Sequence, residues 1–485
     1  MIKLDRAAAE PLHQQLYRQI RDELVSGFSG SSSRLPSSRE LATDIGVSRL
    51  TVSLAFSKLH AEGYLRTKLG SGTFVAESLP ETFLSARKPK NEEQSARRPR
   101  ISDRVTNLQD ERVGKQFDLG APAAEVGAMF LPGLPAVDEF PLEVWERLRA
   151  QVLARKGANL LRYASNRGDA DLRQAIAAYL CDFRGARCHA DQIIVVAGMQ
   201  QAMLICALAL TNPGEAAWIE DPGFPQARRV FAFSGTTIVP RPIDKQGIVL
   251  AGTSSKLSPK VIFVTPSHQY PLGVTMSLRR RTDLIDFAEA RDAYIIEDDY
   301  NSEFRFNGPP LPCLQGLDHA GRVIYAGTMS KILYPSLRLG YLLVPEQLVD
   351  SMAKVRSVMD QHSPAIDQAT LARFITEGFF LSHVKRMRKL YADRREFFVQ
   401  QFNRLLGDRF ILQDSEAGLH FVAWLRKGAD SQTIVRVGAE TGVKPVLLSR
   451  YCISAKLKPA FVFGFAAWSR AQIREGLTKL AAALK

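Results

Sequence analysis

Cysteine is scarce in this 485-residue sequence, which contains five. None of them forms a Cys-x-x-Cys pair and their number is odd, so the sequence predicts neither a cysteine-ligated zinc site nor a disulfide framework. A membrane-length apolar run is also missing, because Gly198, Gln200 and Gln201 interrupt the longest uncharged candidate, residues 193–210. No charged start followed by an apolar stretch suggests a secretion signal. These absences favour a soluble, cytoplasmic chain with reduced thiols and no membrane partner.

The sequence also lacks a region in which its net charge is concentrated. The net charge is +14, of which residues 1–115 carry +5 and the remainder +9. The net positive charge permits an anionic partner, but because it is spread over both parts it does not locate a nucleic-acid-binding domain. With 46% apolar and 24% charged residues, the composition is that of a folded globular protein, and the length indicates two to four domains.

The chain divides into three parts by pattern. Residues 1–78 show short helical patterns and a hairpin, whereas residues 79–115 are rich in charge, proline and serine and are expected to form a flexible linker. From residue 116 to 485, short apolar runs alternate with longer amphipathic stretches, which predicts an α/β domain with a largely parallel sheet covered on both faces. The clearest of these runs are residues 193–197, 261–265, 293–298 and 322–327.

The N-terminal part shows the pattern of a helix-turn-helix with a wing. Its first helix is expected to end at Gly27. Ser37 or Ser38 can cap a second helix, and Gly46 permits a sharp turn before Ser48 caps a third. Two strands, 64–67 and 73–76, are expected around a turn at Gly70, Ser71 and Gly72.

In this geometry the start of the third helix enters the major groove of double-stranded DNA. That places Ser48, Arg49 and Thr51 at base edges or phosphates, with Arg39 reaching in from the second helix. Lys68, Ser71 and Gly72 belong to the wing. These residues resemble the winged-helix domain of the GntR family of transcription factors, whose patterns LPS-x-RELA, GVSR-x-TV and GSGTFV are present almost in full.

In the C-terminal part, Lys331 lies among groups that can bind a phosphate. Thr328 and Ser330 precede it and Arg338 follows in a turn, so hydroxyls and a guanidinium can converge on one dianion. A phosphate beside a lysine suggests pyridoxal 5′-phosphate held by Lys331 as a Schiff base. A further phosphate contact is expected at Gly198, Met199 and Gln200, where a strand leads into a helix.

The pyridine ring of such a cofactor needs a carboxylate beside its nitrogen. The segment Ile295–Tyr300, reading IIEDDY, offers three, and Asp298 is preferred over Glu297 and Asp299, which alternate to the opposite face of the strand. Tyr300 is expected to form a hydrogen bond with the phenolate oxygen of the cofactor. Phe224 could stack on the ring, although an isolated aromatic more often packs in a core.

These pieces in order resemble the fold-type I aminotransferase superfamily: YASNRGDADLR, AGMQQA, EDPGF, SHQYPLG, EDDY, SK and SLRLGY. The resemblance implies that Tyr163 reaches the cofactor phosphate of a neighbouring subunit, and it makes Arg450 the candidate for binding an effector carboxylate. The usual asparagine of the Asn-Pro-x-Gly motif is replaced by Tyr270, which leaves Tyr300 with the phenolate contact. Phe224 stands where tyrosine is common.

The whole chain resembles the MocR subfamily of GntR regulators, in which a winged helix is fused to an aminotransferase-like domain. This implies a head-to-tail homodimer that binds promoter DNA and senses a small amino compound through aldimine exchange at Lys331. The alternative is an active aminotransferase with a fused DNA-binding domain, and residual transaminase activity stays open. A structural DNA-binding protein with a dead enzyme domain is disfavoured because Lys331, Asp298, Tyr300 and Arg338 are all present.

Overall fold

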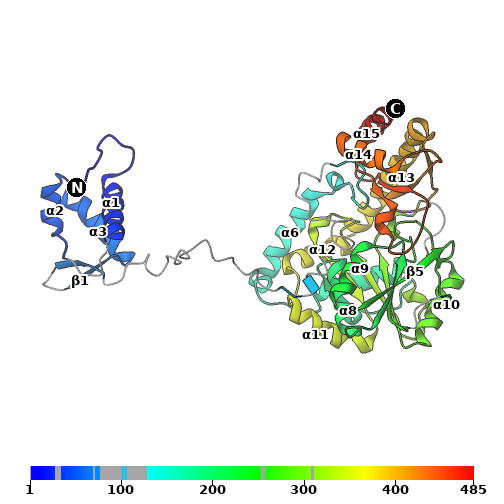
Figure 1. The fold of residues 1–485 in the computed structure, drawn as a ribbon. Helices are drawn as coiled ribbons and strands as arrows, with labels where there is room; N and C mark the ends of the chain where they lie inside the picture. Colours follow the sequence, from blue (N-terminus) through cyan, green and yellow to red (C-terminus); the bar gives the residue numbers. More distant parts are fainter. Residues whose placement is uncertain are drawn as a thin grey trace. The chain divides into compact units, whose positions relative to one another are not determined.

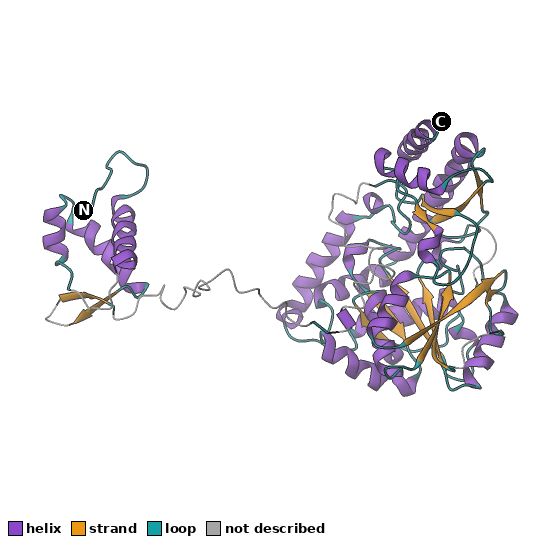
Figure 2. Cartoon of the chain, in the orientation of Figure 1, coloured by secondary structure: helices purple, strands orange, loops and turns teal. Residues whose placement is uncertain are grey.

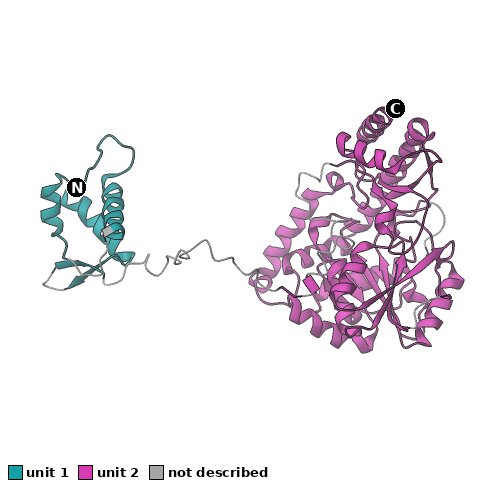
Figure 3. Ribbon diagram, viewed as in Figure 1, with its two compact units in different colours: residues 1–100 teal, residues 101–485 magenta. Residues whose placement is uncertain are grey.

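The computed structural model of the protein describes residues 2–27, 34–68, 72–76, 101–102, 104–105, 128–252, 257–306 and 311–485. The chain forms two compact units, Met1–Arg100 and Ile101–Lys485 (Figure 3). Most of the expected linker, residues 79–115, lies outside the described residues. None of the described helices is long and apolar enough to cross a membrane.

Unit 1 is a three-helix bundle with a hairpin. Its elements are α1 (Leu12–Gly27), α2 (Ser38–Asp44), α3 (Arg49–Ala61), β1 (Leu65–Lys68) and β2 (Gly72–Val75). Ser37 caps α2 in a reciprocal capping box with Glu40, and Ser48 caps α3 by accepting from the backbone N–H of Thr51 at 3.1 Å. Between the two helices Gly46 adopts a φ of +67°, a conformation that suits glycine.

The apolar face of each helix in unit 1 points into one core. Val52 and Leu59 of α3 are fully buried there with Leu16 of α1. The hairpin differs from the expectation by one residue, because Tyr64 still closes the end of α3 through its N–H to Leu59, so β1 begins at Leu65. Gly72 is accordingly the first residue of β2 and pairs with Lys68.

Unit 2 is built on an eight-stranded sheet of order β3-β10-β9-β8-β7-β4-β5-β6 (Figures 1 and 2). Its strands are β3 (Ile193–Val196), β4 (Ala216–Asp221), β5 (Thr237–Asp244), β6 (Gly247–Ile248), β7 (Pro259–Val264), β8 (Tyr294–Asp299), β9 (Val323–Thr328) and β10 (Gly340–Leu343). Strands β5, β4, β7, β8 and β9 are parallel, whereas β10 runs antiparallel to both of its neighbours. The expected largely parallel sheet is therefore present.

Helices cover both faces of this sheet. The helices of unit 2 are α6 (Leu142–Lys156), α7 (Ala170–Arg184), α8 (Met199–Leu210), α9 (Pro225–Phe233), α10 (Leu278–Glu289), α11 (Val349–Met359), α12 (Ala365–Thr376), α13 (Phe379–Leu406), α14 (Ser431–Thr441) and α15 (Arg470–Ala483). Alternate residues of each strand enter opposite cores: in β3, Ile194 packs with α8 and α11, whereas Ile193 packs with α6, α7 and α12. Two-sided burial explains why the strands read as continuous apolar runs.

A smaller antiparallel sheet of order β11-β12-β14-β13 completes the unit. Its strands are β11 (Phe410–Leu412), β12 (His420–Leu425), β13 (Val446–Leu447) and β14 (Ala460–Gly464). An aromatic-rich core, including Phe398, Phe421 and Phe463, joins this sheet to α13, α14 and α15. In the large sheet, parallel strands bring their carboxyl ends to one edge, so the residues that end β4, β8 and β9 gather there.

Candidate functional site

Lys331 lies just after β9, and its amine faces inward. Its Nζ donates to the carbonyl oxygen of Gly133 at 2.8 Å, and a Cβ on Gly133 would come within 3.4 Å of that nitrogen. Burial lowers the pKa of Lys331, while the nearby Asp298 carboxylate acts in the opposite direction. A lowered pKa leaves more of the amine unprotonated, which is the form that attacks a carbonyl group.

Asp298 is the penultimate residue of β8 and is buried on the same face as Ile296, toward α8. Its Oδ1 has no hydrogen-bond partner among the described residues. Burial, together with Asp299 and Glu220, raises the pKa of Asp298 well above its usual range. A buried carboxylate oxygen without a donor is costly. A ligand with a cationic N–H would supply the hydrogen bond that Asp298 lacks.

The two neighbouring carboxylates point to the opposite face of β8, where protein groups donate hydrogen bonds to them. Glu297 accepts from the backbone N–H groups of Leu314 and Gln315, at 2.8 and 3.0 Å. Asp299 accepts from Arg184 and from the hydroxyl of Tyr325. Of the three carboxylates in IIEDDY, Asp298 is the one with an unused oxygen.

Glu220 is a further buried carboxyl group at this edge, and sequence reasoning missed it. Both of its oxygens accept hydrogen bonds, from the N–H and hydroxyl of Thr265 and from Nε2 of Gln269. Burial raises the pKa of Glu220 to about 7 despite these bonds. An acidic residue near the end of an otherwise apolar strand was the signal that could have identified it.

The residues predicted to hold a phosphate come together beside α8. Gly198 precedes this helix with a φ of +108°, and a Cβ there would be 3.4 Å from Nη1 of Arg338. The strand register places Gly340 opposite both Val196 and Thr328, which brings Thr328 close to the start of α8. The hydroxyl of Thr328 accepts from the N–H of Ser330 at 3.2 Å. Met199 and Gln200 form the first turn of α8.

Arg338 has a positive φ of +50°, which is uncommon for a residue with a side chain. It ends the 3-10 turn Pro335–Leu337 directly before β10. This backbone conformation directs its guanidinium toward Gly198, where a Cβ would already be in van der Waals contact with it. The N-terminal amides of α8, the helix dipole and Arg338 thus all favour an anion at one point.

Aromatic rings line the neighbouring wall of the site. Tyr270 makes edge contacts with Phe224, Tyr300 and Tyr451, with ring centroids 5.9, 5.7 and 5.3 Å apart. The hydroxyl of Tyr300 donates to the carbonyl oxygen of His268 at 2.9 Å, and the hydroxyls of Tyr270 and Tyr451 are 3.2 Å apart. Tyr270 and Tyr451 are therefore members of the site that sequence reasoning did not assign to it.

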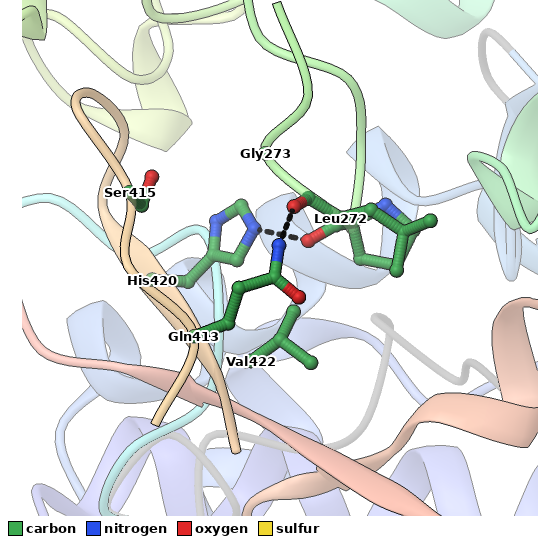
Figure 4. Close-up of a pocket in the computed structure, with 7 residues that line it drawn as sticks. Leu272, Gly273, Gln413, Ser415, His420 and Val422 are labelled. Atoms are coloured by element: carbon green, nitrogen blue, oxygen red, sulfur yellow. Dashed lines mark hydrogen bonds between the residues drawn. The ribbon is translucent and has the colours of Figure 1, made fainter. Parts of the chain in front are cut away.

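The loop that carries Tyr270 is fastened to the small sheet. Gln413 donates from Nε2 to the carbonyl oxygen of Leu272 at 2.6 Å, and Nε2 of His420 lies 2.9 Å from the carbonyl oxygen of Pro271 (Figure 4). Burial lowers the pKa of His420 to about 4, so its ring is neutral and donates to this carbonyl near pH 7. These contacts fix the segment that replaces the usual asparagine motif.

Asp221, the last residue of β4, holds the segment that follows Arg450. Its carboxylate accepts four hydrogen bonds at 2.8 Å, from the N–H groups of Ile453, Ser454 and Ala455 and from the hydroxyl of Ser454. Arg450 itself is exposed in the 3-10 turn Leu448–Tyr451, while Tyr451 points inward. The assignment of Arg450 to an effector carboxylate stays a prediction.

Tyr163 is a surface residue. It is 89% exposed and makes an edge contact with the ring of His362, at 6.2 Å. Its predicted contact with the phosphate of a neighbouring subunit stays a prediction.

In unit 1, the predicted DNA-binding residues lie on α2, α3 and the hairpin. Arg39, Arg49 and Lys68 are exposed, whereas the hydroxyls of Ser48 and Thr51 lie 2.8 Å from each other in the cap of α3. Ser71 lies outside the described residues. The guanidinium of Arg34 lies against Gly72, within 3.1 Å of a Cβ built there.

Comparison with known families matches both units. Residues 12–75 match the bacterial regulatory proteins of the gntR family, and residues 135–479 match the aminotransferase class I and II family. The probable rhizopine catabolism regulatory protein MocR of Rhizobium meliloti is 38% identical over all of this chain and 96% of its own length. The pyridoxine biosynthesis transcriptional regulator PdxR of Corynebacterium glutamicum is 31% identical over 97% of this chain and 95% of its own length.

Among solved structures, the α-aminoadipate aminotransferase LysN of Thermus thermophilus superposes with a TM-score of 0.70. It covers 79% of this chain and 97% of its own, and at 23% identity it shows the fold alone. Taken with the winged helix, these matches define a DNA-binding transcriptional regulator whose second unit has the fold-type I aminotransferase fold. The chain belongs to the MocR-type regulators of the GntR family.

Proposed function

We propose that this regulator binds pyridoxal 5′-phosphate at Lys331 and senses a small amino compound there. The observation that carries the proposal is the buried Oδ1 of Asp298, which has no donor among the described residues and would accept from a protonated pyridine nitrogen. When bound, the cofactor supplies an aldehyde carbon that bonds reversibly to primary amines. An amine of the right shape therefore competes with Lys331 for that carbon.

Each group around Asp298 has a proposed role. The N–H groups of Gly198, Met199 and Gln200 bind the phosphate together with Thr328, Ser330 and Arg338. Phe224 lies against the ring, and Tyr300 orients the phenolate oxygen. Tyr163 adds a phosphate contact from the second subunit of a head-to-tail homodimer, and Arg450 binds the carboxylate of the effector.

The proposed response passes from this site to DNA. Displacement of Lys331 and binding of the effector carboxylate by Arg450 together favour one arrangement of the domains. The effector shifts the populations of the arrangements only if it binds them with different affinities. Residues 79–115 would act as the linker between the DNA-binding domain 1–78 and the effector domain 116–485. In unit 1, Arg39, Arg49, Thr51, Lys68 and their neighbours Ser48, Ser71 and Gly72 would contact promoter DNA in the cytoplasm.

The names of two relatives suggest effectors to test. One is a probable regulator of rhizopine catabolism and another regulates pyridoxine biosynthesis, so compounds related to rhizopine or pyridoxine are the first to test. A second candidate function, an active aminotransferase, is favoured by the presence of Lys331 together with Asp298. It predicts release of a keto acid, with Lys331 moving the proton.

The cofactor proposal is tested by borohydride reduction of protein loaded with pyridoxal phosphate, followed by mass spectrometry of its peptides. We expect the label on Lys331, and none in Lys331→Ala. Lys389→Ala, which removes an exposed lysine on α13, serves as the matched control and should keep the label. A label spread over surface lysines, equal in all three proteins, contradicts the proposal.

A further inference from the structure

Two cysteines of unit 2 lie side by side although no sequence motif pairs them. Cys181 belongs to the last turn of α7, and Cys188 lies in the segment between α7 and the 3-10 turn Ala190–Gln192. Their Sγ atoms are 3.8 Å apart. Cys181 is exposed and Cys188 is half-buried, whereas Cys206 and Cys313 are buried in the core.

We propose that Cys181 and Cys188 form a dithiol modification site, which a peroxide oxidises to an intramolecular disulfide and a dithiol reductant reopens. A disulfide holds its sulfurs roughly 2.0 Å apart, so the pair must approach by roughly 1.8 Å. The segment between them turns at Gly185, which ends α7 in the left-handed region with a φ of +62°. A seven-residue separation leaves little chain to order on closure.

The chemistry assigns different roles to the two thiols. Cys181, open to solvent, attacks one peroxide oxygen as a thiolate, which breaks the O–O bond, releases hydroxide and leaves a sulfenic acid on Cys181. The sulfur of Cys188 then attacks the Cys181 sulfur, and the hydroxyl leaves as water with the Cys188 proton. In total two thiols lose two electrons and two protons, and one peroxide becomes two waters.

Burial, and secondly the adjacent Cys181, raise the pKa of the Cys188 thiol to about 12. Cys188 therefore stays protonated near pH 7 and is protected from direct attack by an oxidant. Because Cys181 is exposed and Cys188 is half-buried, an oxidant reaches Cys181 first, and Cys188 follows as the resolving cysteine.

The pair lies on a segment that is bonded to the candidate cofactor site. Arg184, between the two cysteines in sequence, donates from Nε and Nη2 to Asp299, at 3.0 and 2.5 Å. Its carbonyl oxygen accepts from the N–H of Cys313, and Arg187 exchanges two hydrogen bonds with the side chain of Gln315. Since Asp299 adjoins Asp298, closing the disulfide pulls on a segment that supports the pyridine-binding carboxylate.

The first test counts thiols in the full-length protein after limited hydrogen peroxide treatment. Wild type should lose two of its five thiols, and the peptide carrying residues 181 and 188 should lose the mass of two hydrogens, both restored by dithiothreitol. Cys181→Ser should lose none under the same conditions, and Cys188→Ser should stop at the sulfenic acid. Cys452→Ser, which removes a half-buried thiol elsewhere, should still form the disulfide.

Equal thiol loss in Cys181→Ser and wild type overturns the proposal, as does a disulfide that links two subunits or a Cys181 that is overoxidised without pairing. Circular dichroism of each variant checks that the fold is kept.

A second experiment, which rests on the proposed cofactor site, titrates oxidised and reduced protein with pyridoxal phosphate. We expect a severalfold difference in affinity for wild type and none for Cys181→Ser, and equal affinities would overturn the coupling. Because the thiol count does not need the cofactor, failure of the cofactor site is distinguishable from failure of the thiol pair.

Discussion

At the scale of single residues, the site depends on carboxylates that the fold has removed from water. Four buried carboxyl groups lie at the carboxyl ends of β4 and β8, the two strands that flank β7: Glu220, Glu297, Asp298 and Asp299. Three of them are bonded by protein donors, and Asp298 keeps one oxygen free of donors among the described residues. A buried acid without a donor is more costly to keep than a paired one, so the difference between these four groups points to a bound partner.

The first prediction concerns Asp298→Asn. Loss of a charge-assisted hydrogen bond, about 1.5–3 kcal/mol, should weaken binding of pyridoxal phosphate about 10- to 100-fold. Titration of the apoprotein followed by visible absorbance measures this. Asp286→Asn, which changes an exposed carboxylate on α10, is the control and should bind as wild type does. Unchanged affinity in Asp298→Asn would rule out its assigned role.

The second prediction concerns pH and Glu220. Because burial raises its folded pKa to about 7, above an ordinary value of 4.5, the folded state binds the proton more tightly than the unfolded state. The contribution of Glu220 to stability is therefore present in full below about pH 4.5 and is lost as the pH rises toward 7.

Glu220→Gln removes this titration and keeps an oxygen acceptor for Thr265. Its free energy of unfolding minus that of wild type should increase from pH 5 to pH 8, by at most about 3 kcal/mol, because only wild type loses stability over this range. Urea unfolding at the two pH values measures the change. A difference between variant and wild type that is independent of pH contradicts the raised pKa.

At the scale of elements, the sequence predicted the regular parts closely and the contacts between distant segments poorly. The apolar runs that became β3, β7, β8 and β9 were recognisable because two-sided burial leaves continuous hydrophobic stretches. The hairpin was shifted by one residue because Tyr64 is bonded to α3, a contact that local alternation does not reveal. The pairing of Tyr270 with Tyr451 joins residues 181 positions apart, which no spacing rule captures.

The third prediction concerns the recognition helix α3. Arg49 is exposed at its first position, so Arg49→Ala should weaken DNA binding at least tenfold and reduce the slope of log affinity against log salt by about one. Arg18→Ala, which removes an exposed arginine of α1 that is paired with Glu10, is the matched control and should leave both quantities unchanged. Fluorescence anisotropy at several salt concentrations checks this. An unaffected slope in Arg49→Ala would remove Arg49 from the interface.

At the scale of the whole molecule, one chain joins a unit that reads DNA to a unit with the fold of an amine-handling enzyme. The motifs and their order made this combination predictable from sequence, and the two family matches confirm it. The proposed communication between the units could not be predicted from sequence, because it depends on the relative stability of whole arrangements and not on any local pattern. The proposed sensing requires a coupling free energy of about 1–3 kcal/mol between amine binding and DNA binding.

The most direct measurement of that coupling is the affinity of the full-length, cofactor-loaded protein for a DNA fragment selected from a random-sequence pool, with and without an amine. The amine is one that shifts the visible absorbance of the loaded protein. We predict that this amine changes DNA affinity about fivefold or more in wild type and not at all in Lys331→Ala. An amine that is converted to a keto acid while DNA affinity stays constant would contradict the sensing role and favour the aminotransferase.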